Sequence, residues 1–364
     1  MKPTATPVYR PTASCIKRSF LNSGKRHLLI TGGRGSGKTT LLSHLCPADT
    51  PGITTHAVPR EAVFLCDRQT GQQAMIGRYD AALPGTENKM VICPEGFLEL
   101  GIPALEACMQ SHAPQVCIDE IGYLECGCEA YQQALSRLMQ KKGLVAAVRK
   151  QTLPFLESLL HREDAFVVDL DQPYGNMGCV IMASGEGRRF GSNKLMADFR
   201  GQPLICRSLD ATEGLFARRV VVTRHPEIAA LCEARQVECI LHDQPFRSDT
   251  IRLGLEAMPT MDGCLFCPGD QPLLTRETVA SLLLSAHHAP ETIWRTAFED
   301  TPGAPVWFPA WAFDPLRTLP QGKGGGYLIL QHPDQVSMLP VLFPQELQDV
   351  DTPEQLAALA AFRA

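Results

Sequence analysis

The sequence predicts an α/β protein built from two three-layer α/β/α domains. Its 364 residues exceed the length of a typical single domain. Short apolar runs alternate with helix-like stretches along the chain, a pattern typical of parallel sheets covered by helices. Two of the apolar runs, at 27–31 and 179–183, lead directly into glycine-rich loops. We therefore expect one domain around each glycine-rich loop.

Each predicted strand is a short apolar run bounded by polar or turn-forming residues. The strands expected in the first half are 27–31, 62–65, 90–92, 115–118, 144–148 and 166–168. The strands expected in the second half are 179–183, 219–223, 238–241 and 263–266. A helix is expected at 39–45, immediately after the first glycine-rich loop.

A polar segment at 169–176 separates the two halves. Its Asp, Pro, Gly and Asn residues favour turns, and no apolar periodicity crosses it. We place the domain boundary near Tyr174. The domains are therefore expected at 25–173 and 174–364, with residues 1–24 as an N-terminal extension.

The amino-acid composition argues against two classes of binding partner, nucleic acids and membranes. The formal net charge is −5, whereas nucleic-acid binding needs a basic surface, so no nucleic-acid partner is expected. No apolar run is long enough to span a bilayer, and the polar N-terminus lacks a signal-peptide core, so no membrane partner is expected. The 14 cysteines are scattered, often inside apolar runs, which predicts reduced thiols in a cytoplasmic protein. The Cys126–Cys128 and Cys264–Cys267 pairs lack the further ligands of a structural zinc, so no zinc site is expected.

The first glycine-rich loop fits the phosphate-binding motif G-x-x-x-x-G-K-[ST] in full. It follows an apolar strand and opens a helix, which is the context this motif requires. Backbone N–H groups of such a loop hold phosphate oxygens, Lys38 would act on the β- and γ-phosphates, and Thr39 would ligate Mg²⁺. The nucleotide-binding residues expected here are Gly32, Gly35, Gly37, Lys38, Thr39 and Thr40.

Two carboxylates end the predicted strand 115–118. Acidic side chains at the end of a buried strand are costly unless a ligand uses them. We expect Asp119 to bind Mg²⁺ and Glu120 to orient or deprotonate an attacking water. A solvated strand end is the alternative interpretation.

The second glycine-rich loop, at 184–191, carries two cations suited to phosphate. Arg189 offers a planar fork and Lys194 a point charge, and together they can clamp a triphosphate during attack on its α-phosphate. Both are expected to be catalytic. The nucleotide-binding residues expected in this loop are Ala183, Gly185, Gly187, Arg189 and Lys194.

Two further carboxylates are candidates for a metal site beside this loop. Asp270 follows the predicted strand 263–266, and ligands gather at such strand ends in open α/β sheets. Asp270 is therefore expected to be catalytic and to hold Mg²⁺, and Asp351 is expected to complete the site. For the segment around Asp351, a role as a helix cap only is the alternative.

The first half resembles the THEP1-like nucleoside-triphosphatases, small P-loop enzymes first described from thermophiles. The resemblance covers about 25–170 and rests on the loop 32–39, the run 118–125 and Pro154-Phe155-Leu156. It implies a P-loop NTPase fold and Mg²⁺-dependent hydrolysis of ATP or GTP. Two departures from the family pattern are Gly52-Ile53-Thr54-Thr55 and Tyr123, the latter where a Lys or Arg is usual.

The second half resembles the MobA-like nucleotidyltransferases over about 178–362. The loop 185–194, Asp270-Gln271-Pro272 and the run 349–353 carry the resemblance. It implies a Rossmann-like fold and, from the Arg-Phe-Gly form of the loop, transfer of CMP from CTP to molybdopterin with release of pyrophosphate. By the same resemblance, Ser248 and Thr250 contact base and ribose. Departures are Ser184, for Ala or Gly, and the stretch 321–326, which lacks the usual acid and arginine.

Two other functions stay open at this point. The chain could bind nucleotide and carry cofactor to an apo-molybdenum hydroxylase without turnover. It could also transfer a nucleotidyl group to another phosphorylated acceptor, such as a sugar or polyol phosphate. Pyrophosphate release distinguishes the enzyme from the carrier.

Overall fold

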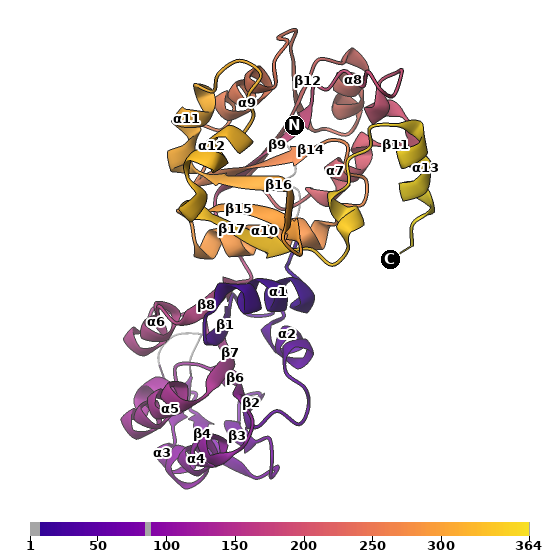
Figure 1. Cartoon of the computed structure of the whole chain (residues 1–364). Coiled ribbons are helices and arrows are strands. Elements are labelled where there is room, and N and C mark those ends of the chain that lie inside the picture. The colour runs from indigo at the N-terminus through magenta and orange to yellow at the C-terminus, as the bar shows by residue number, and fades with distance from the viewer. Residues whose placement is uncertain (1–7, 84–88, 364) are drawn as a thin grey trace. The chain divides into compact units, whose positions relative to one another are not determined.

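A computed structural model describes residues 8–83 and 89–363 of the protein (Figure 1). The chain divides into two compact units. The first unit is Ser23–Pro173, and the second combines Met1–Asn22 with Tyr174–Ala364. Each unit is described by itself below.

The first unit is built on an eight-stranded mixed sheet. The strands β2, β6, β7, β1 and β8 run parallel, while β3, β4 and β5 extend the sheet in antiparallel fashion. The apolar runs predicted β3 and β5 but not β2 and β4, because β2 and β4 bury few of their side chains and alternate with polar residues. In spatial order the strands are β5 (Met90–Ile92), β4 (Gln73–Tyr79), β3 (Ala62–Asp67), β2 (Gly52–Val58), β6 (Gln115–Ile121), β7 (Gly143–Val148), β1 (His27–Thr31) and β8 (Ala165–Asp169).

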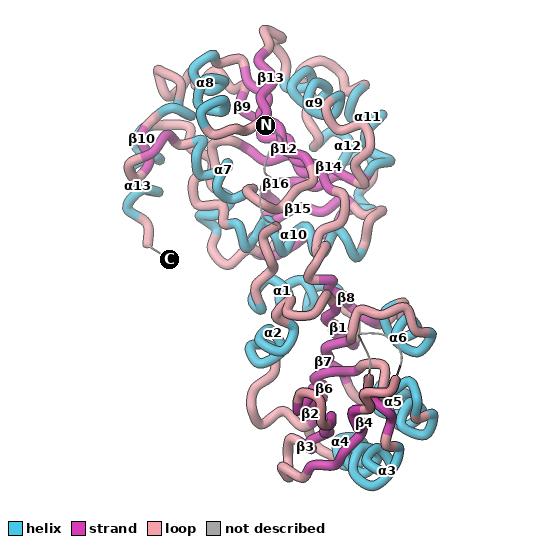
Figure 2. Tube along the Cα trace, turned by 180° about the vertical axis from the view of Figure 1, so that it is seen from behind, coloured by secondary structure: helices cyan, strands magenta, loops and turns pink. Residues whose placement is uncertain are grey.

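Helices lie on both faces of this sheet. Figures 1 and 2 show α2 on one side of β1, β6 and β7, and α5 and α6 on the other. Helix α5 shows why: its buried side chains recur at helical spacing and form one apolar stripe. The helices are α2 (Lys38–Leu45), α3 (Pro94–Gly96), α4 (Ile102–Gln110), α5 (Glu129–Lys141) and α6 (Pro154–Leu160), with a 3-10 turn η2 (Glu125–Gly127) before α5.

The second unit is built on a seven-stranded sheet. Strands β13, β12, β9 and β14 are parallel, β16 runs antiparallel to β14 and β15, and β17 is parallel to β15. In spatial order they are β13 (Glu238–Leu241), β12 (Arg218–Thr223), β9 (Met177–Ala183), β14 (Gly263–Pro268), β16 (Thr301–Pro309), β15 (Ile293–Phe298) and β17 (Val336–Pro340). A two-stranded ribbon joins β10 (Asp198–Phe199) to β11 (Gln202–Pro203).

Helices also cover both faces of the second sheet, so each unit has the expected three-layer α/β arrangement. Figures 1 and 2 show α9, α11 and α12 on one side and α7 and α8 on the other. Within the described residues, no helix is long and apolar enough to cross a membrane. The helices are α7 (Ile205–Ala211), α8 (Pro226–Ala234), α9 (Arg247–Glu256), α10 (Arg276–His288), α11 (Phe313–Arg317), α12 (Gly326–Gln331) and α13 (Pro353–Ala361), with a 3-10 turn η3 (Lys194–Met196).

Residues 1–24 were expected as an extension, but their described part contains helix α1 (Ala13–Ser23), which packs on α10 of the second unit. Thr12 Oγ1 donates to Glu277 Oε1 at 2.8 Å, and Ser19 Oγ donates to the Ser281 carbonyl at 2.8 Å. The apolar face of α1 includes Phe20, which is 6% exposed. The first unit is therefore inserted between two segments of the second.

Replacing Phe20 with alanine is expected to destabilise the second unit by about 3–5 kcal/mol, because it removes a buried ring from α1, which belongs to that unit. All three tryptophans, Trp294, Trp307 and Trp311, belong to this unit, so tryptophan fluorescence during urea unfolding reports on it selectively. Leu21, which is 67% exposed, supplies the control: its alanine variant should unfold at the wild-type urea concentration. An unchanged fluorescence midpoint in the Phe20 variant would show that α1 does not stabilise the second unit.

Candidate active sites

The loop between β1 and α2 forms a phosphate cradle. Gly37 has φ of +95°, in the left-handed region that favours glycine, and it leads directly into the first turn of α2. Lys38 Nζ donates to the carbonyls of Gly32 and Gly33 at 2.9 and 3.2 Å, so the lysine folds back over the loop. Thr39 and Thr40 follow it in the first turn of α2, whose N–H groups suit an anion.

The structure brings Thr39 and Asp119 together although 80 positions separate them in the chain. Thr39 Oγ1 donates to Asp119 Oδ1 at 3.2 Å. Burial raises the pKa of the Asp119 carboxyl, and the hydrogen bond from Thr39 partly offsets this effect. A hydroxyl and a carboxylate oxygen at one point are the hard oxygen ligands that Mg²⁺ prefers, so these residues fit the expected ion.

An arginine that the sequence analysis did not single out lies beside Glu120. Arg149, just after β7, places Nε 3.5 Å from Glu120 Oε1, and its guanidinium lies 5.3 Å from the centre of the Tyr123 ring. Strand β7 lies between β1, which leads into the P-loop, and β6, which contains the two acids. A residue that follows β7 therefore lies near both. Arg149 thus supplies a cation next to Tyr123, where the family resemblance expects Lys or Arg. No local motif marks this arginine.

Glu125, in the turn η2, is a buried carboxyl near Glu120. It is 4% exposed, and the Gly122 N–H donates to its Oε2 at 2.7 Å. Burial raises the pKa of Glu125 from 4.5 to about 7, and the Gly122 hydrogen bond only partly offsets this effect. The folded protein therefore holds this group protonated at pH values where the unfolded chain ionises it.

The stability of the first unit should consequently fall as pH rises from about 4.5 to about 7, and then level off. The folded state binds one proton more than the unfolded state in that window, which amounts to about 3 kcal/mol in total. Hydrogen exchange of the buried β6 and β7 amides at pH 5 and pH 8, corrected for intrinsic rates, measures it. Glu125→Gln should flatten the dependence, whereas Glu129→Gln, at an exposed position in α5, should retain it. Equal slopes in the two variants would refute the assignment.

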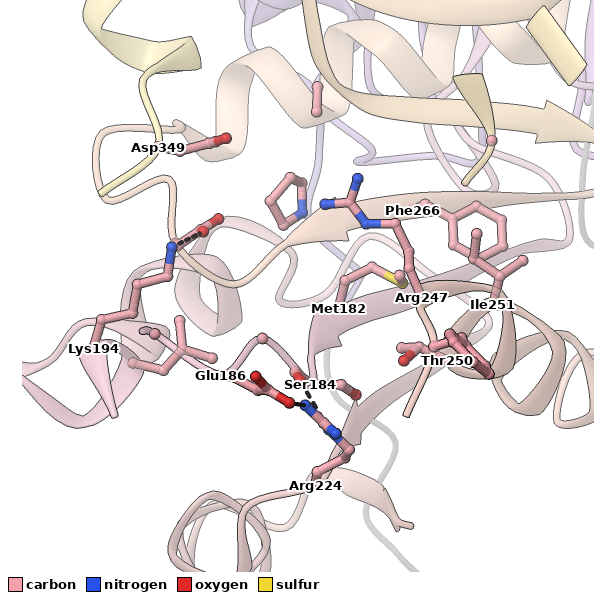
Figure 3. Close-up of a pocket in the computed structure, with 18 of the residues that line it drawn as sticks. Met182, Ser184, Glu186, Lys194, Arg224, Arg247, Thr250, Ile251, Phe266 and Asp349 are labelled. Carbon is pink, nitrogen blue, oxygen red and sulfur yellow. Dashed lines mark hydrogen bonds and ion pairs between the residues drawn. The ribbon is translucent and has the colours of Figure 1, made fainter. Parts of the chain in front are cut away.

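The second unit contains a cavity of about 740 Å³ at the carboxyl ends of β9 and β14. The loop 184–189 forms one wall, and Figure 3 shows Lys194 on the opposite side from Phe266 and Ile251. Gly185, Gly187, Arg189, Lys194, Thr250, Asp270 and Asp351 all line the cavity. Ala183 and Ser248 are buried next to lining residues but do not line it themselves.

Lys194 is the centre of a charge cluster in this cavity. Its Nζ donates to Asp270 Oδ2 at 2.6 Å and to Asp351 Oδ1 at 3.0 Å, while Arg189 reaches the other Asp351 oxygen at 2.8 Å. Burial opposes the charge of Lys194, which is 8% exposed, but the two carboxylates outweigh it and raise its pKa. The hydrogen bond from Lys194 in turn lowers the pKa of Asp351. Residues from three distant parts of the chain thus form one electrostatic unit.

A third carboxylate, Asp349, lines the same cavity without having been assigned a role from the sequence. Burial and the neighbouring charge of Asp270 raise its pKa, and Gln271 Nε2 donates to it at 3.0 Å. In the part of the chain that is described, no cluster of three or more His, Cys, Asp or Glu could hold a metal. Mg²⁺ is commonly held by one or two carboxylates together with substrate phosphates, so Asp270 and Asp351 fit it.

Arg224 and His242, which follow the strands β12 and β13, hold the loop 184–186 in place through hydrogen bonds. Ser184 Oγ donates to the Val222 carbonyl at 3.1 Å and lies 2.9 Å from His242 Nε2. Arg224 Nε donates to the Ser184 carbonyl at 3.1 Å, and its NH2 group donates to Glu186 Oε1 at the same distance. The hydroxyl that replaces the family's usual Ala or Gly is therefore used to anchor the loop. Arg224 and His242 could not be predicted from the sequence, because no loop motif includes them.

The fold and these two sites define a class of two-domain enzyme with two sites for nucleotide phosphates. One site belongs to a P-loop NTPase unit and the other to a nucleotidyltransferase unit. Residues 27–176 match the NTPase family, and residues 179–336 match the MobA-like NTP transferase domain. The chain thus combines a THEP1-like NTPase domain with a MobA-like NTP transferase domain.

Known proteins resemble one half or the other. The nucleoside-triphosphatase THEP1 of Thermotoga sp. (strain RQ2) is 26% identical over 155 residues, covering 41% of this chain and 88% of the relative. The 3-deoxy-manno-octulosonate cytidylyltransferase of Neisseria meningitidis serogroup A is 32% identical over 91 residues, covering 24% of this chain and 36% of that enzyme. The crystal structure of Rv0371c from Mycobacterium tuberculosis H37Rv has a TM-score of 0.46 and 22% identity, covering 52% of this chain and 100% of that one.

Proposed function

We propose that the second unit transfers CMP from CTP to molybdopterin and releases pyrophosphate, and that the first unit hydrolyses ATP or GTP. The observation that carries the transferase proposal is the Lys194 cluster. It places two cations, Lys194 and Arg189, and two carboxylates, Asp270 and Asp351, beside a glycine-rich loop. When pyrophosphate leaves a triphosphate, cationic side chains and a divalent ion stabilise the negative charge that builds up. The two carboxylates would hold that ion.

The reaction joins an acceptor oxygen to the α-phosphorus of the nucleotide. The bond from that phosphorus to the bridging oxygen breaks, and pyrophosphate leaves with the electron pair. Arg189 and Lys194 would bind the phosphate oxygens on which charge accumulates. Asp270 and Asp351 would hold Mg²⁺, which when bound neutralises part of the same charge. The loop 185–187 would let the triphosphate approach the backbone closely.

Two findings support CTP and molybdopterin as the substrates. The Arg189-Phe190-Gly191 form of the loop resembles cytidylyltransferases for molybdopterin, and one relative of the chain is itself a cytidylyltransferase. The match to the MobA-like domain supports a molybdopterin acceptor. The dinucleotide product would pass to an apo-molybdenum hydroxylase in the cytoplasm.

The first unit would hydrolyse NTP with the residues gathered around its P-loop. Lys38 and the loop N–H groups would bind the phosphates, and Thr39 with Asp119 would hold Mg²⁺. Glu120 would orient or deprotonate the attacking water, and the adjacent Arg149 would hold the Glu120 carboxylate in place.

Pyrophosphate release from the purified full chain tests the transferase proposal. CTP, GTP, ATP and UTP are each supplied with Mg²⁺ and molybdopterin, and CTP is expected to give the fastest release. A sugar acid is the second candidate acceptor, because the Neisseria relative acts on 3-deoxy-manno-octulosonate. Release with that acid but not with molybdopterin would favour this second candidate. Tight cofactor binding with no release from any nucleotide would favour a carrier.

A further inference from the structure

One cation in the cavity of the second unit has no acidic partner among the residues that the structure describes. Arg188, Arg189, Lys194, Arg224 and Arg247 all line the cavity. Arg188 and Arg224 form ion pairs with Glu186, Arg189 pairs with Asp351, and Lys194 pairs with both Asp270 and Asp351. Arg247, the first residue of α9, forms no ion pair with any residue that the structure describes, and its side chain is exposed to the cavity. A positive charge left unpaired in a pocket is suited to an anionic ligand.

The wall on this side of the cavity is apolar and aromatic. Phe266 and Phe308 meet edge to face, with ring centres 5.8 Å apart. Figure 3 shows the Arg247 guanidinium extending into the pocket between Phe266 and Asp349. A flat ring system is the ligand body that such a wall accommodates best. The other apolar lining residues on this side are Ile251, Val306 and Leu316.

The glycine run 324–326 lets the backbone close over the same part of the cavity. A Cβ on Gly325 would lie 2.6 Å from the Phe308 ring, and a Cβ on Gly324 would lie 2.9 Å from Arg247 Cδ. Any other residue at these positions would displace the ring or the arginine. The glycines therefore preserve the place of both side chains.

We propose that Arg247 binds the phosphate of a phosphomonoester acceptor whose flat ring lies against Phe266 and Phe308. The proposal rests on the transferase function proposed above and specifies how its acceptor is held. A phosphate dianion carries its own ionised oxygen for attack on the α-phosphorus, so it needs no base. It does need a cation, because it must approach a triphosphate that is also negatively charged. Arg247 provides that charge without losing a carboxylate partner.

Kinetics of pyrophosphate release test this assignment. Arg247→Gln should raise the KM for molybdopterin about 10- to 100-fold, the loss typical of one charge-assisted hydrogen-bond pair, and leave the KM for CTP unchanged. The KM of Arg247→Lys for molybdopterin should lie between those of Arg247→Gln and the wild type, because lysine retains the charge without the planar fork. The matched control is Arg252→Gln on the same helix, which is paired with Glu256 outside the cavity and should retain wild-type kinetics.

A binding measurement separates this proposal from the transferase function. Phenyl phosphate is titrated into the full chain by calorimetry in the presence of CTP and without Mg²⁺. The wild type and Arg252→Gln should bind it, and Arg247→Gln should bind it about 10- to 100-fold more weakly. Equal affinities, or no binding by the wild type, would overturn the role of Arg247. Binding that depends on Arg247 in a protein that releases no pyrophosphate would instead refute the transferase function alone.

Discussion

Replacing Asp270 with asparagine is expected to slow pyrophosphate release by about 100- to 1,000-fold. Asparagine keeps the shape of the side chain but removes the charge that Lys194 contacts at 2.6 Å and that would hold Mg²⁺. Asp351 still pairs with Lys194 at 3.0 Å in this variant, so the buried ammonium keeps one partner and the fold should persist. The rate is measured with CTP and molybdopterin at saturating Mg²⁺.

The control for this experiment is Asp314→Asn, because the Asp314 side chain is 91% exposed on α11 and lies outside the cavity. It should react at the wild-type rate. Tryptophan fluorescence verifies that the second unit of both variants is folded, since all three tryptophans lie there. A folded Asp270→Asn protein with the wild-type rate would exclude Asp270 from the reaction.

The second large effect is expected in the first unit, where Glu120→Gln should lower NTP hydrolysis by about 100- to 10,000-fold. Glutamine cannot accept a proton from water, yet it leaves the phosphate cradle intact. Nucleotide should therefore still bind to this variant. Lys38→Ala removes the charge that faces the phosphates, so it should weaken binding as well as hydrolysis. Phosphate release and binding of a fluorescent ATP analogue measure the two properties separately.

Glu129→Gln is the matched control, since Glu129 is exposed at the start of α5, away from the P-loop. It should hydrolyse NTP as the wild type does. Full hydrolysis by Glu120→Gln would mean that another group activates the water. Loss of nucleotide binding in that variant would mean that Glu120 supports the cradle rather than the chemistry.

Most of the local architecture could be predicted from the chain. Strands β1, β6 and β9 are continuous apolar runs because both faces of a central parallel strand are buried. Strands β2 and β4 were missed, since strands with one partly exposed face contain polar residues and lack a continuous run. Helix α1 was missed for a related reason: its apolar stripe is short and becomes meaningful only against α10.

The residues of the candidate sites also fall into two groups, those that the sequence predicts and those that only the fold brings together. Glycine-rich loops and strand-end acids could be found without coordinates, because short-range backbone geometry and burial dictate them. Arg149, Arg247 and Asp349 carry no such local signature. Their positions depend on which strands are neighbours and on where the chain returns to the sheet, as when Lys194 meets Asp351 across 157 positions. Charge pairing between distant residues follows from strand order and packing, and these arise only once the whole chain has folded.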